Sequence, residues 1–533
     1  MTQDHTSGAI LDMEKVRAAG GEVVPGALDP AELGLLAAND TGNATRFKTR
    51  FGHHFRFVPQ LGWYAYTGTH WSAEQGQRLA HLAAREMARL IHDEATALEQ
   101  RGASPRAVAA LHRFAIRSGN RRSIENLLKV AEDDLRAGLD EFDRDPLLLN
   151  CRNGTLRFVK DETEGWVVRL DPHCASDMLS RITRTKYDPN AIAPLWDAHL
   201  IKMQPDEEMR DYLQRQFGYI ILGHGDEQAF FVHQGRGGDG KSTTVNTIRR
   251  VLGNYAITAD VRTFLAPKDA SAGGGDRASP GMARLAGDFR LVSTSEPPRG
   301  SALNEGLVKA VTGGAPVVAR QLREGLFEYI PRWKLVIECN ALPYVPGEDH
   351  GIWRRAKLAS WRIQLRRAEM DPMLETKLIL RESAGILTWL VNGSLDYLNR
   401  GALAEPTAAR ESLEDFRRGS NTFGEWLSEF VVLDPKASVT NKALYASYCE
   451  FCTATGDDPI NAKAFGRSLS NQQITTRSGP GGRTPDKRRD WLRFGARLKT
   501  GADCERAQCD HAVTGDNAGE QPDPTAIEFD EVF

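Results

Sequence analysis

Apolar residues recur at helical spacing in several parts of the chain. Leu79, Leu82, Met87, Leu90 and Ile91 fall on one face of a 3.6-residue period, and this pattern predicts amphipathic helices between residues 72 and 139. Similar patterns predict further helices over 196–203, 206–221, 243–252, 374–398, 422–432, 440–455 and 462–470.

Shorter apolar runs bounded by turn residues predict strands. Alternating aromatic residues between positions 43 and 71 indicate a small β-meander, and Asn153-Gly154 between two apolar runs indicates a hairpin. Further strands are predicted for 229–232, 289–296 and 333–340, with a second hairpin at 317–330. Because helices and strands alternate along this length, we expect a multidomain α/β protein with an α-rich N-terminal domain.

Composition narrows the functional classes only slightly. The 533 residues are 41% hydrophobic and 26% charged, with a net charge of −3, so a nucleic-acid-binding face would have to be a local basic patch. Seven cysteines are too thinly spread for a disulfide framework. The chain has neither a run of 18 apolar residues nor the apolar segment of a signal peptide, and we expect a cytoplasmic protein with no membrane partner.

The segment between the strand at 229–232 and the helix at 243–252 fits the phosphate-loop pattern G-x-x-x-x-G-K-[ST]. Its glycines let successive backbone N–H groups turn toward phosphate oxygens, and the helix N-terminus adds a partial positive charge. Lys241 is expected to contact the β- and γ-phosphates of ATP, and Ser242 to bind Mg²⁺. The predicted ATP-binding residues are Gly235, Arg236, Gly237, Gly238, Asp239, Gly240, Lys241, Ser242 and Thr243.

Two later strands end in polar residues suited to nucleotide hydrolysis. One ends in Ser295-Glu296, where phosphate-loop NTPases usually carry an acidic pair. Glu296 is the candidate to polarise the attacking water, and it joins Ser242 as a candidate metal residue. The other strand ends in Asn340, which is suited to hold that water against the γ-phosphate.

Two pairs of arginines are candidates to contact phosphates. Arg354 and Arg355 are adjacent, and one of them is a candidate to stabilise charge in the transition state, with a structural ion pair as the open alternative. Arg320 and Arg323 flank the tip of the hairpin at 317–330 and are candidate DNA contacts.

Three predicted helices beyond residue 420, followed by a hairpin at 474–498, have the layout of a winged helix. Eight basic and two acidic residues lie between Arg477 and Lys499, a local basic patch that can grip phosphates without reading sequence. A solvated basic wing is the alternative. The candidate DNA contacts here are Lys463, Arg467, Arg477, Arg483, Lys487, Arg488 and Arg489.

The order of these parts resembles the superfamily 3 helicase core. A phosphate loop, a strand ending in Glu296, the KAVTGG segment at 309–314 with its hairpin, a strand ending in Asn340 and a paired arginine follow one another. More narrowly, the chain is similar to the helicase portion of the phage and plasmid primase family, related to the poxvirus-type primase–helicases. Upstream, the segments that carry the resemblance are NATRF at 43–47, Gly62-Trp63, DPLLLNCRNGTL at 145–156, and YDP at 187–189 followed by Trp196.

This resemblance implies an AAA+-like P-loop core with a parallel sheet, in a homo-hexameric ring that moves on single-stranded or forked DNA with ATP between subunits. It assigns Lys241 and Ser242 to phosphate and Mg²⁺, Glu296 to the acidic strand end and Asn340 to the sensor position. It also implies that Arg354 or Arg355 reaches a neighbour's ATP and that the hairpin lines the channel. Many family members carry a preceding primase domain, for which the first 39 residues are too few, so we expect a separate primase and other replication proteins as partners.

Together these patterns predict a leader, three domains and a tail. The expected parts are a disordered leader at 1–39, a mostly helical domain at 40–200, the ATPase domain at 201–405, a linker at 406–418, a winged helix at 420–499 and an acidic disordered tail at 500–533. The predicted function is an ATP-dependent replicative DNA helicase of a phage, plasmid or integrated element. The alternatives are another P-loop ATPase, such as a clamp loader or small-molecule kinase, and an ATP-controlled origin-binding or assembly protein that does not unwind DNA.

Overall fold

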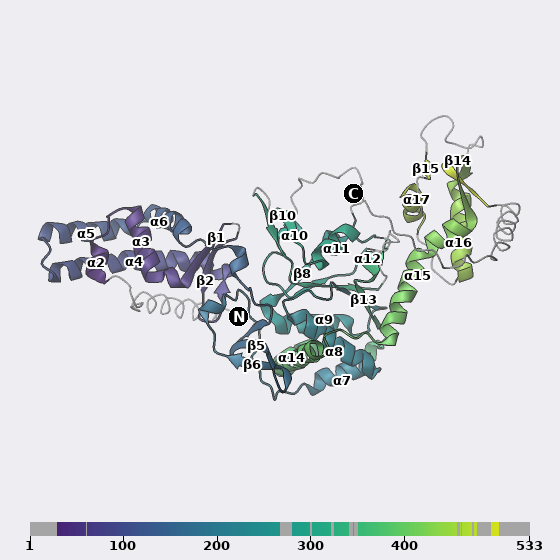
Figure 1. Cartoon of the computed structure of the whole chain (residues 1–533), viewed down its shortest axis with the longest axis horizontal. Helices are drawn as coiled ribbons and strands as arrows, with labels where there is room; N and C mark the ends of the chain where they lie inside the picture. Colours follow the sequence, from purple (N-terminus) through teal and green to yellow (C-terminus); the bar gives the residue numbers. More distant parts are fainter. Residues whose placement is uncertain are drawn as a thin grey trace, which may run out of the picture. The chain divides into compact units, whose positions relative to one another are not determined.

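The computed structural model describes eleven segments of the chain, which fall into two compact units (Figure 1). One unit comprises residues 1–343 and 349–414, and the other comprises residues 344–348 and 415–533. None of the described helices is both long and apolar enough to cross a bilayer. The described residues are 29–59, 61–266, 280–298, 301–320, 325–340, 345, 350–455, 459, 461–471, 474–476 and 492–499.

The first unit begins with helices packed on a small antiparallel sheet. The helices are α2 (Pro30–Gly34), α3 (Asp40–Phe51), α4 (Ala73–Gln100), α5 (Pro105–Ser118) and α6 (Arg121–Asp134). The sheet has the order β1 (Phe55–Val58), β2 (Gly62–Tyr66) and β3 (Trp71–Ser72). The predicted helical stretch from 72 to 139 is confirmed, and α4 buries Leu79, Met87 and Ile91 as their spacing predicted.

Two predictions for this region need correction. The β-meander begins only at Phe55, because residues 43–47 lie in helix α3. The disordered leader predicted at 1–39 also ends too late, because α2 starts at Pro30. Asp29 and Glu32 form a capping box there, and the buried side chains of Ala31 and Leu33 give the short helix an apolar face.

Arg46 has a structural role in this part of the fold. Its side chain is fully buried and donates to a Glu94 oxygen at 2.7 Å, while Arg50 meets the other oxygen of Glu94 at 3.2 Å. A buried, paired guanidinium of this kind is not available to nucleic acid, so these residues anchor α3 on α4.

A second antiparallel sheet leads to the central domain. It contains β4 (Leu148–Cys151), β5 (Gly154–Asp161) and β6 (Gly165–Asp171) in that order. The hairpin predicted at Asn153-Gly154 is confirmed, since Cys151 pairs with Gly154. The predicted helices at 196–203 and 206–221 are α7 (Pro194–Met203) and α8 (Glu207–Ile221).

The centre of the first unit is a five-stranded parallel sheet. Its order is β13 (Ala356–Trp361), β7 (Phe230–Gly235), β12 (Lys334–Cys339), β9 (Leu291–Thr294) and β8 (Ala256–Ala259). This mixed α/β architecture, with a helical region before a parallel sheet, is consistent with a P-loop core.

Helices cover both faces of this sheet. α8, α9 (Lys241–Leu252) and α14 (Ser383–Arg400) share one apolar core with β7, and Figure 1 shows α11 (Glu305–Thr312) on the opposite side from α9. The antiparallel pair β10 (Val317–Arg320) and β11 (Leu326–Tyr329) confirms the second predicted hairpin, although its tip lies outside the described residues. The remaining helices are α10 (Pro280–Ala283), α12 (His350–Trp353) and α13 (Leu374–Arg381).

The C-terminal part combines helices with a three-stranded antiparallel sheet of order β14-β16-β15. Its elements are α15 (Thr407–Phe430), β14 (Val431–Thr440), α16 (Asn441–Thr455), α17 (Ala462–Asn471), β15 (Thr475–Thr476) and β16 (Leu492–Leu498). The predicted linker at 406–418 is wrong, because α15 begins at Thr407. Ala409, Ser412 and Phe416 are buried at helical spacing, a pattern that the many charged residues between them obscure.

Candidate functional site

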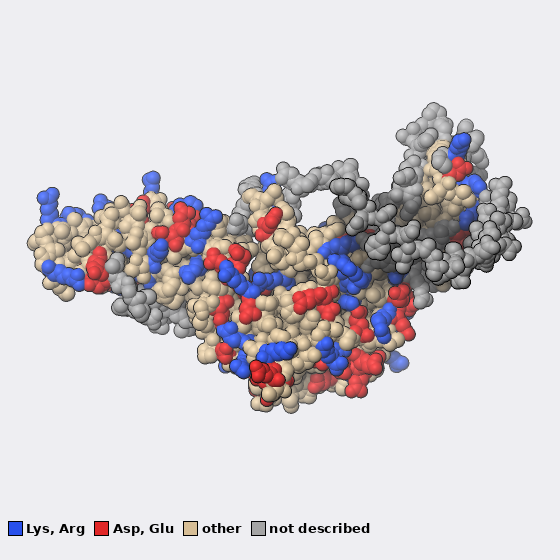
Figure 2. Space-filling model, in the orientation of Figure 1, with Lys and Arg blue, Asp and Glu red and all other residues tan. Residues whose placement is uncertain are grey.

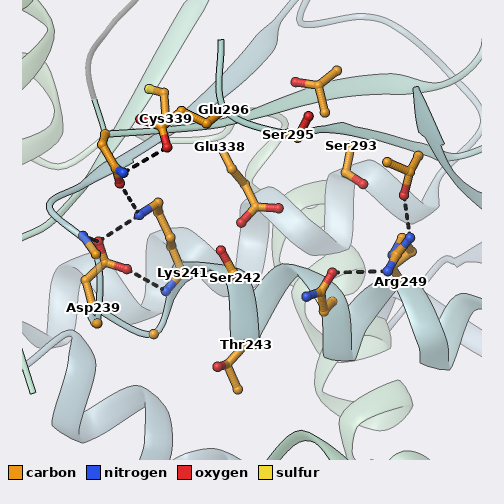
Figure 3. A pocket seen from close by; sticks show the side chains of 17 residues that line it. Asp239, Lys241, Ser242, Thr243, Arg249, Ser293, Ser295, Glu296, Glu338 and Cys339 are labelled. Atoms are coloured by element: carbon orange, nitrogen blue, oxygen red, sulfur yellow. Dashed lines mark hydrogen bonds and ion pairs between the residues drawn. The ribbon is translucent and has the colours of Figure 1, made fainter. Parts of the chain in front are cut away.

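A pocket opens at the carboxyl ends of β7, β9 and β12. Its volume is about 530 Å³, and it is lined mainly by residues 237–243, 293–296 and 338–340 (Figure 3). In open α/β sheets ligands bind at this edge of the strands, and the volume is within the range of pockets for drug-sized ligands.

The phosphate loop joins the end of β7 to the start of α9. At two of its positions only glycine fits. Gly240 has a φ of +78°, and a Cβ atom there would lie 2.6 Å from the Met203 side chain. At Gly235 a Cβ atom would lie 1.8 Å from a carboxylate oxygen of Asp239. The loop therefore requires glycine at both positions, once for the left-handed backbone and once for the close approach of Asp239.

Asp239 fills the inside of this loop. Its carboxylate accepts hydrogen bonds from the backbone N–H groups of Gly237 at 3.1 Å and Lys241 at 3.2 Å, and from the Lys241 ammonium at 2.9 Å. Backbone N–H groups of such a loop also bind phosphate oxygens. A nucleotide at this loop would therefore compete with Asp239 for Lys241.

Three of the sequence-predicted residues meet in one hydrogen-bonded chain. The Lys241 ammonium donates to the Asn340 side-chain oxygen at 2.9 Å, and the Asn340 amide nitrogen donates to a Glu296 oxygen at 2.9 Å. These residues come from α9, from the end of β12 and from the segment after β9. The strand order brings them together, because β12 lies between β7 and β9.

Glu338 lines the pocket and was missed by the sequence reasoning. This half-buried side chain lies on β12, and Figure 3 shows it and the Ser242 side chain pointing toward each other. Burial raises the pKa of Glu338, against the opposing effects of the nearby Ser242 hydroxyl and the positive charge of Lys241. The available signal was a lone carboxylate in an apolar strand, two residues before Asn340 and so on the same strand face.

The remaining predicted nucleotide residues are arranged around this group. Ser242 and Glu296 are exposed to the pocket, and Gly237, Gly238 and Gly240 line it. Thr243 lines it as well, but in Figure 3 its side chain points away from Glu338. Arg236 is exposed and is not among the lining residues.

The two adjacent arginines lie at the amino ends of the strands, on the opposite side of the sheet from the pocket. Arg355 precedes β13, and its carbonyl accepts from the backbone N–H of Phe230 at the start of β7. The phosphate loop follows the opposite end of β7, and a strand of six residues is about 20 Å long. Arg354 and Arg355 are therefore too distant to complete the pocket of their own chain.

These arginines have different surroundings. Arg355 is only 9% exposed, and its guanidinium donates to the Gly351 carbonyl at 2.8 Å and to the Gln228 side chain at 3.1 Å. Arg354 is exposed, and within the described ranges no hydrogen bond or ion pair holds its side chain.

The predicted DNA contacts are only partly described. Arg320 is half-buried on β10, and Lys463 and Arg467 lie on helix α17 with side chains outside the description. Arg323, Arg477, Arg483, Lys487, Arg488 and Arg489 lie outside the described residues. Where side chains are coloured in Figure 2, positive and negative groups are interspersed.

Comparison with known proteins connects this chain to helicases. Residues 44–205 match the family described as "D5 N terminal like". Over 225 residues the chain is 29% identical to "Putative helicase L207/L206" of Acanthamoeba polyphaga mimivirus, covering 41% of this chain and 22% of that protein. Over 265 residues it is 25% identical to "Putative helicase 022R" of Frog virus 3, covering 47% of this chain and 27% of that protein.

These matches are distant and partial. The chain spans about a quarter of the length of the curated relatives it matches. An apo structure of the NrS-1 C-terminal region is similar at 12% identity with a TM-score of 0.33, over 58% of this chain and 76% of that one. The chain thus contains a D5 N-terminal-like region and is distantly similar to viral proteins named as helicases.

Proposed function

We propose that this protein is an ATP-dependent DNA helicase of the superfamily 3 type, working as a homo-hexameric ring in the replication of a phage, plasmid or integrated element. The observation that carries the proposal is the chain of hydrogen bonds from Lys241 through Asn340 to Glu296 in one pocket. The distant similarity to viral proteins named as helicases supports the choice of DNA unwinding among the uses of ATP.

In this proposal Lys241 exchanges Asp239 and Asn340 for the β- and γ-phosphates of ATP. Glu296 then polarises the attacking water, and Asn340 orients it. The oxygen donors at the pocket, above all the exposed Ser242 hydroxyl and the carboxylates nearby, fit Mg²⁺, a hard cation that prefers oxygen ligands. When bound, Mg²⁺ neutralises charge on the phosphate oxygens.

Arg354 is the arginine that we assign to the neighbouring subunit's ATP. It is exposed, whereas the Arg355 guanidinium already binds Gly351 and Gln228. Its distance from the phosphate loop of its own chain is the reason to place ATP between subunits, where an arginine supplied in trans can stabilise transition-state charge.

DNA contact is proposed for two regions. In the β10–β11 hairpin, Val318 and Leu326 are 55% and 57% exposed beside Arg320. Arg323, the other candidate of this hairpin, lies outside the described residues. We further propose an N-terminal domain that runs from α2 to residue 200, an ATPase domain at 201–405 and a winged helix at 420–499, in which Lys463, Arg467 and the basic residues from Arg477 to Arg489 grip phosphates.

The test is ATP turnover with and without single-stranded DNA, run beside unwinding of a forked duplex, with Lys241→Ala as the inactive control. We expect turnover that DNA stimulates, strand separation, and loss of both in a folded Lys241→Ala protein. Turnover indifferent to DNA without unwinding would favour an assembly or origin-binding ATPase instead. Turnover retained by Lys241→Ala would remove this lysine from the mechanism.

A further inference from the structure

The acidic position usually used for Mg²⁺ is altered in this chain. Phosphate-loop NTPases hold the metal with the loop Ser or Thr and a carboxylate at the end of a neighbouring strand. Here that strand end reads Ser295-Glu296. Ser295 carries no negative charge, and Glu296 accepts a hydrogen bond from Asn340 at 2.9 Å, which suits it to act on the water rather than on the metal.

Glu338 lies beside the altered position, on the adjacent strand. β12 and β9 are parallel and in register, with Ile337 opposite Thr294. One residue further along both strands come Glu338 and Ser295. Since residues opposite one another in a sheet project from the same face, Glu338 belongs to the place where the strand-end carboxylate is missing.

The position of Glu338 in the pocket supports the same conclusion. Its side chain points toward that of Ser242, the residue assigned to Mg²⁺ in the phosphate loop, and both line the pocket (Figure 3). Within the described residues no Lys or Arg forms an ion pair with Glu338, and the Lys241 ammonium binds Asp239 and Asn340 instead. This half-buried carboxylate lines the same pocket as Lys241 and Arg249, whose positive charges act on it without forming an ion pair in the described residues.

We propose that Glu338 replaces the missing strand-end carboxylate and, together with Ser242, holds Mg²⁺ at the nucleotide phosphates. This inference rests on the proposed function, because it needs ATP bound at the phosphate loop. The purely structural alternative is that Glu338 only faces Ser242 and helps to fix the start of α9.

The variant Glu338→Gln separates these roles, since the amide keeps size and hydrogen-bonding capacity but removes the charge. We would measure binding of a fluorescent non-hydrolysable ATP analogue to the full chain, with Mg²⁺ and with EDTA. We expect Glu338→Gln to lose about 10- to 100-fold of the enhancement by Mg²⁺, the usual effect of weakening a metal site. Metal-free binding should not weaken, because removing a carboxylate beside the phosphates relieves charge repulsion. Glu207→Gln, an exposed carboxylate on α8, is the matched control and should retain the full enhancement.

Enhancement by Mg²⁺ that survives in Glu338→Gln would overturn the inference while leaving the proposed function intact. Wild-type protein that binds no nucleotide would overturn both. If Glu338→Gln does not fold, the exchange variant Ser295→Asp/Glu338→Ser is measured instead. It returns the carboxylate to the strand end, and it should bind the analogue with the enhancement that Ser295→Ala/Glu338→Ser lacks; equal enhancement in these two variants would again reject the role.

Discussion

The two adjacent arginines before β13 differ in what their side chains touch. Because the Arg354 side chain is exposed, we expect Arg354→Ala to leave the melting temperature unchanged while lowering ATP turnover by about 10³-fold or more, the usual effect of losing an arginine finger. Arg355→Ala removes the partner of Gly351 and Gln228, and should cost about 1–3 kcal/mol of folding free energy. Thermal denaturation and turnover, measured on both variants, test this difference.

Mixing experiments test whether Arg354 acts across subunits. Arg354→Ala subunits keep an intact phosphate loop, and Lys241→Ala subunits keep an intact arginine, so rings containing both should regain part of the turnover. Mixed assembly would be checked with differently tagged chains. Mixed rings as inactive as either parent would contradict action in trans.

Gly240 offers a second residue-scale prediction. Its φ of +78° and the nearby Met203 side chain leave no room for a methyl group, and the left-handed backbone alone costs about 1–2 kcal/mol for other residues. Gly240→Ala should therefore lower both stability and nucleotide affinity. Gly401→Ala is a suitable control, because Gly401 has a φ of +71° with open space around it, so it should lower stability but leave nucleotide affinity unchanged.

At the scale of elements, buried histidines make the packing of helices on the sheet sensitive to acid. Burial lowers the pKa of His199 on α7 to about 4 and that of His233 on β7 to about 3. Both are neutral when folded, whereas an unfolded histidine takes up a proton near pH 6.5. The stability that they contribute is thus complete above pH 6.5 and is lost as the pH falls toward 4.

The measurement is the melting temperature between pH 7.5 and pH 4. We expect a decline below about pH 6.5, and a shallower decline in His199→Gln. The glutamine amide can still hydrogen-bond to the Thr244 hydroxyl, which lies 2.9 Å from Nε2 of His199. His81→Gln on α4 controls for the loss of a histidine elsewhere. An identical pH profile for wild type and His199→Gln would rule out this contribution.

The strands and helices near the pocket were predictable from local patterns, but their neighbours were not. The phosphate loop, Glu296 and Asn340 could be selected as candidates because each has a local sequence signal at a strand or helix end. Glu338 was not selected because its proposed role depends on β12 lying between β7 and β9, and pairing between distant strands leaves no trace in a local pattern. The start of α15 was missed because charged residues separate its few buried positions.

For the whole molecule, the division at Glu414 predicts separable activities. Ala409 packs in the main core of the first unit, so a protein ending at Glu414 keeps this contact. We expect it to retain ATP turnover but to bind single-stranded DNA more weakly and with a smaller dependence on salt, because fewer phosphates are neutralised. Binding titrations at several salt concentrations test this, and unchanged affinity and salt dependence would place the main DNA contacts in the first unit.

The length of β7 and β13 also makes activity depend on protein concentration under our proposal. In each chain the phosphate loop follows the carboxyl end of β7, and Arg354 precedes the amino end of β13. Under our proposal, a single chain therefore lacks an arginine at its own ATP site. An open row of chains leaves one end incomplete, and only ring closure gives every chain a full site. Specific activity should therefore fall on dilution, while nucleotide affinity falls less, and the concentration at which activity is half-lost would report the strength of the contact between subunits.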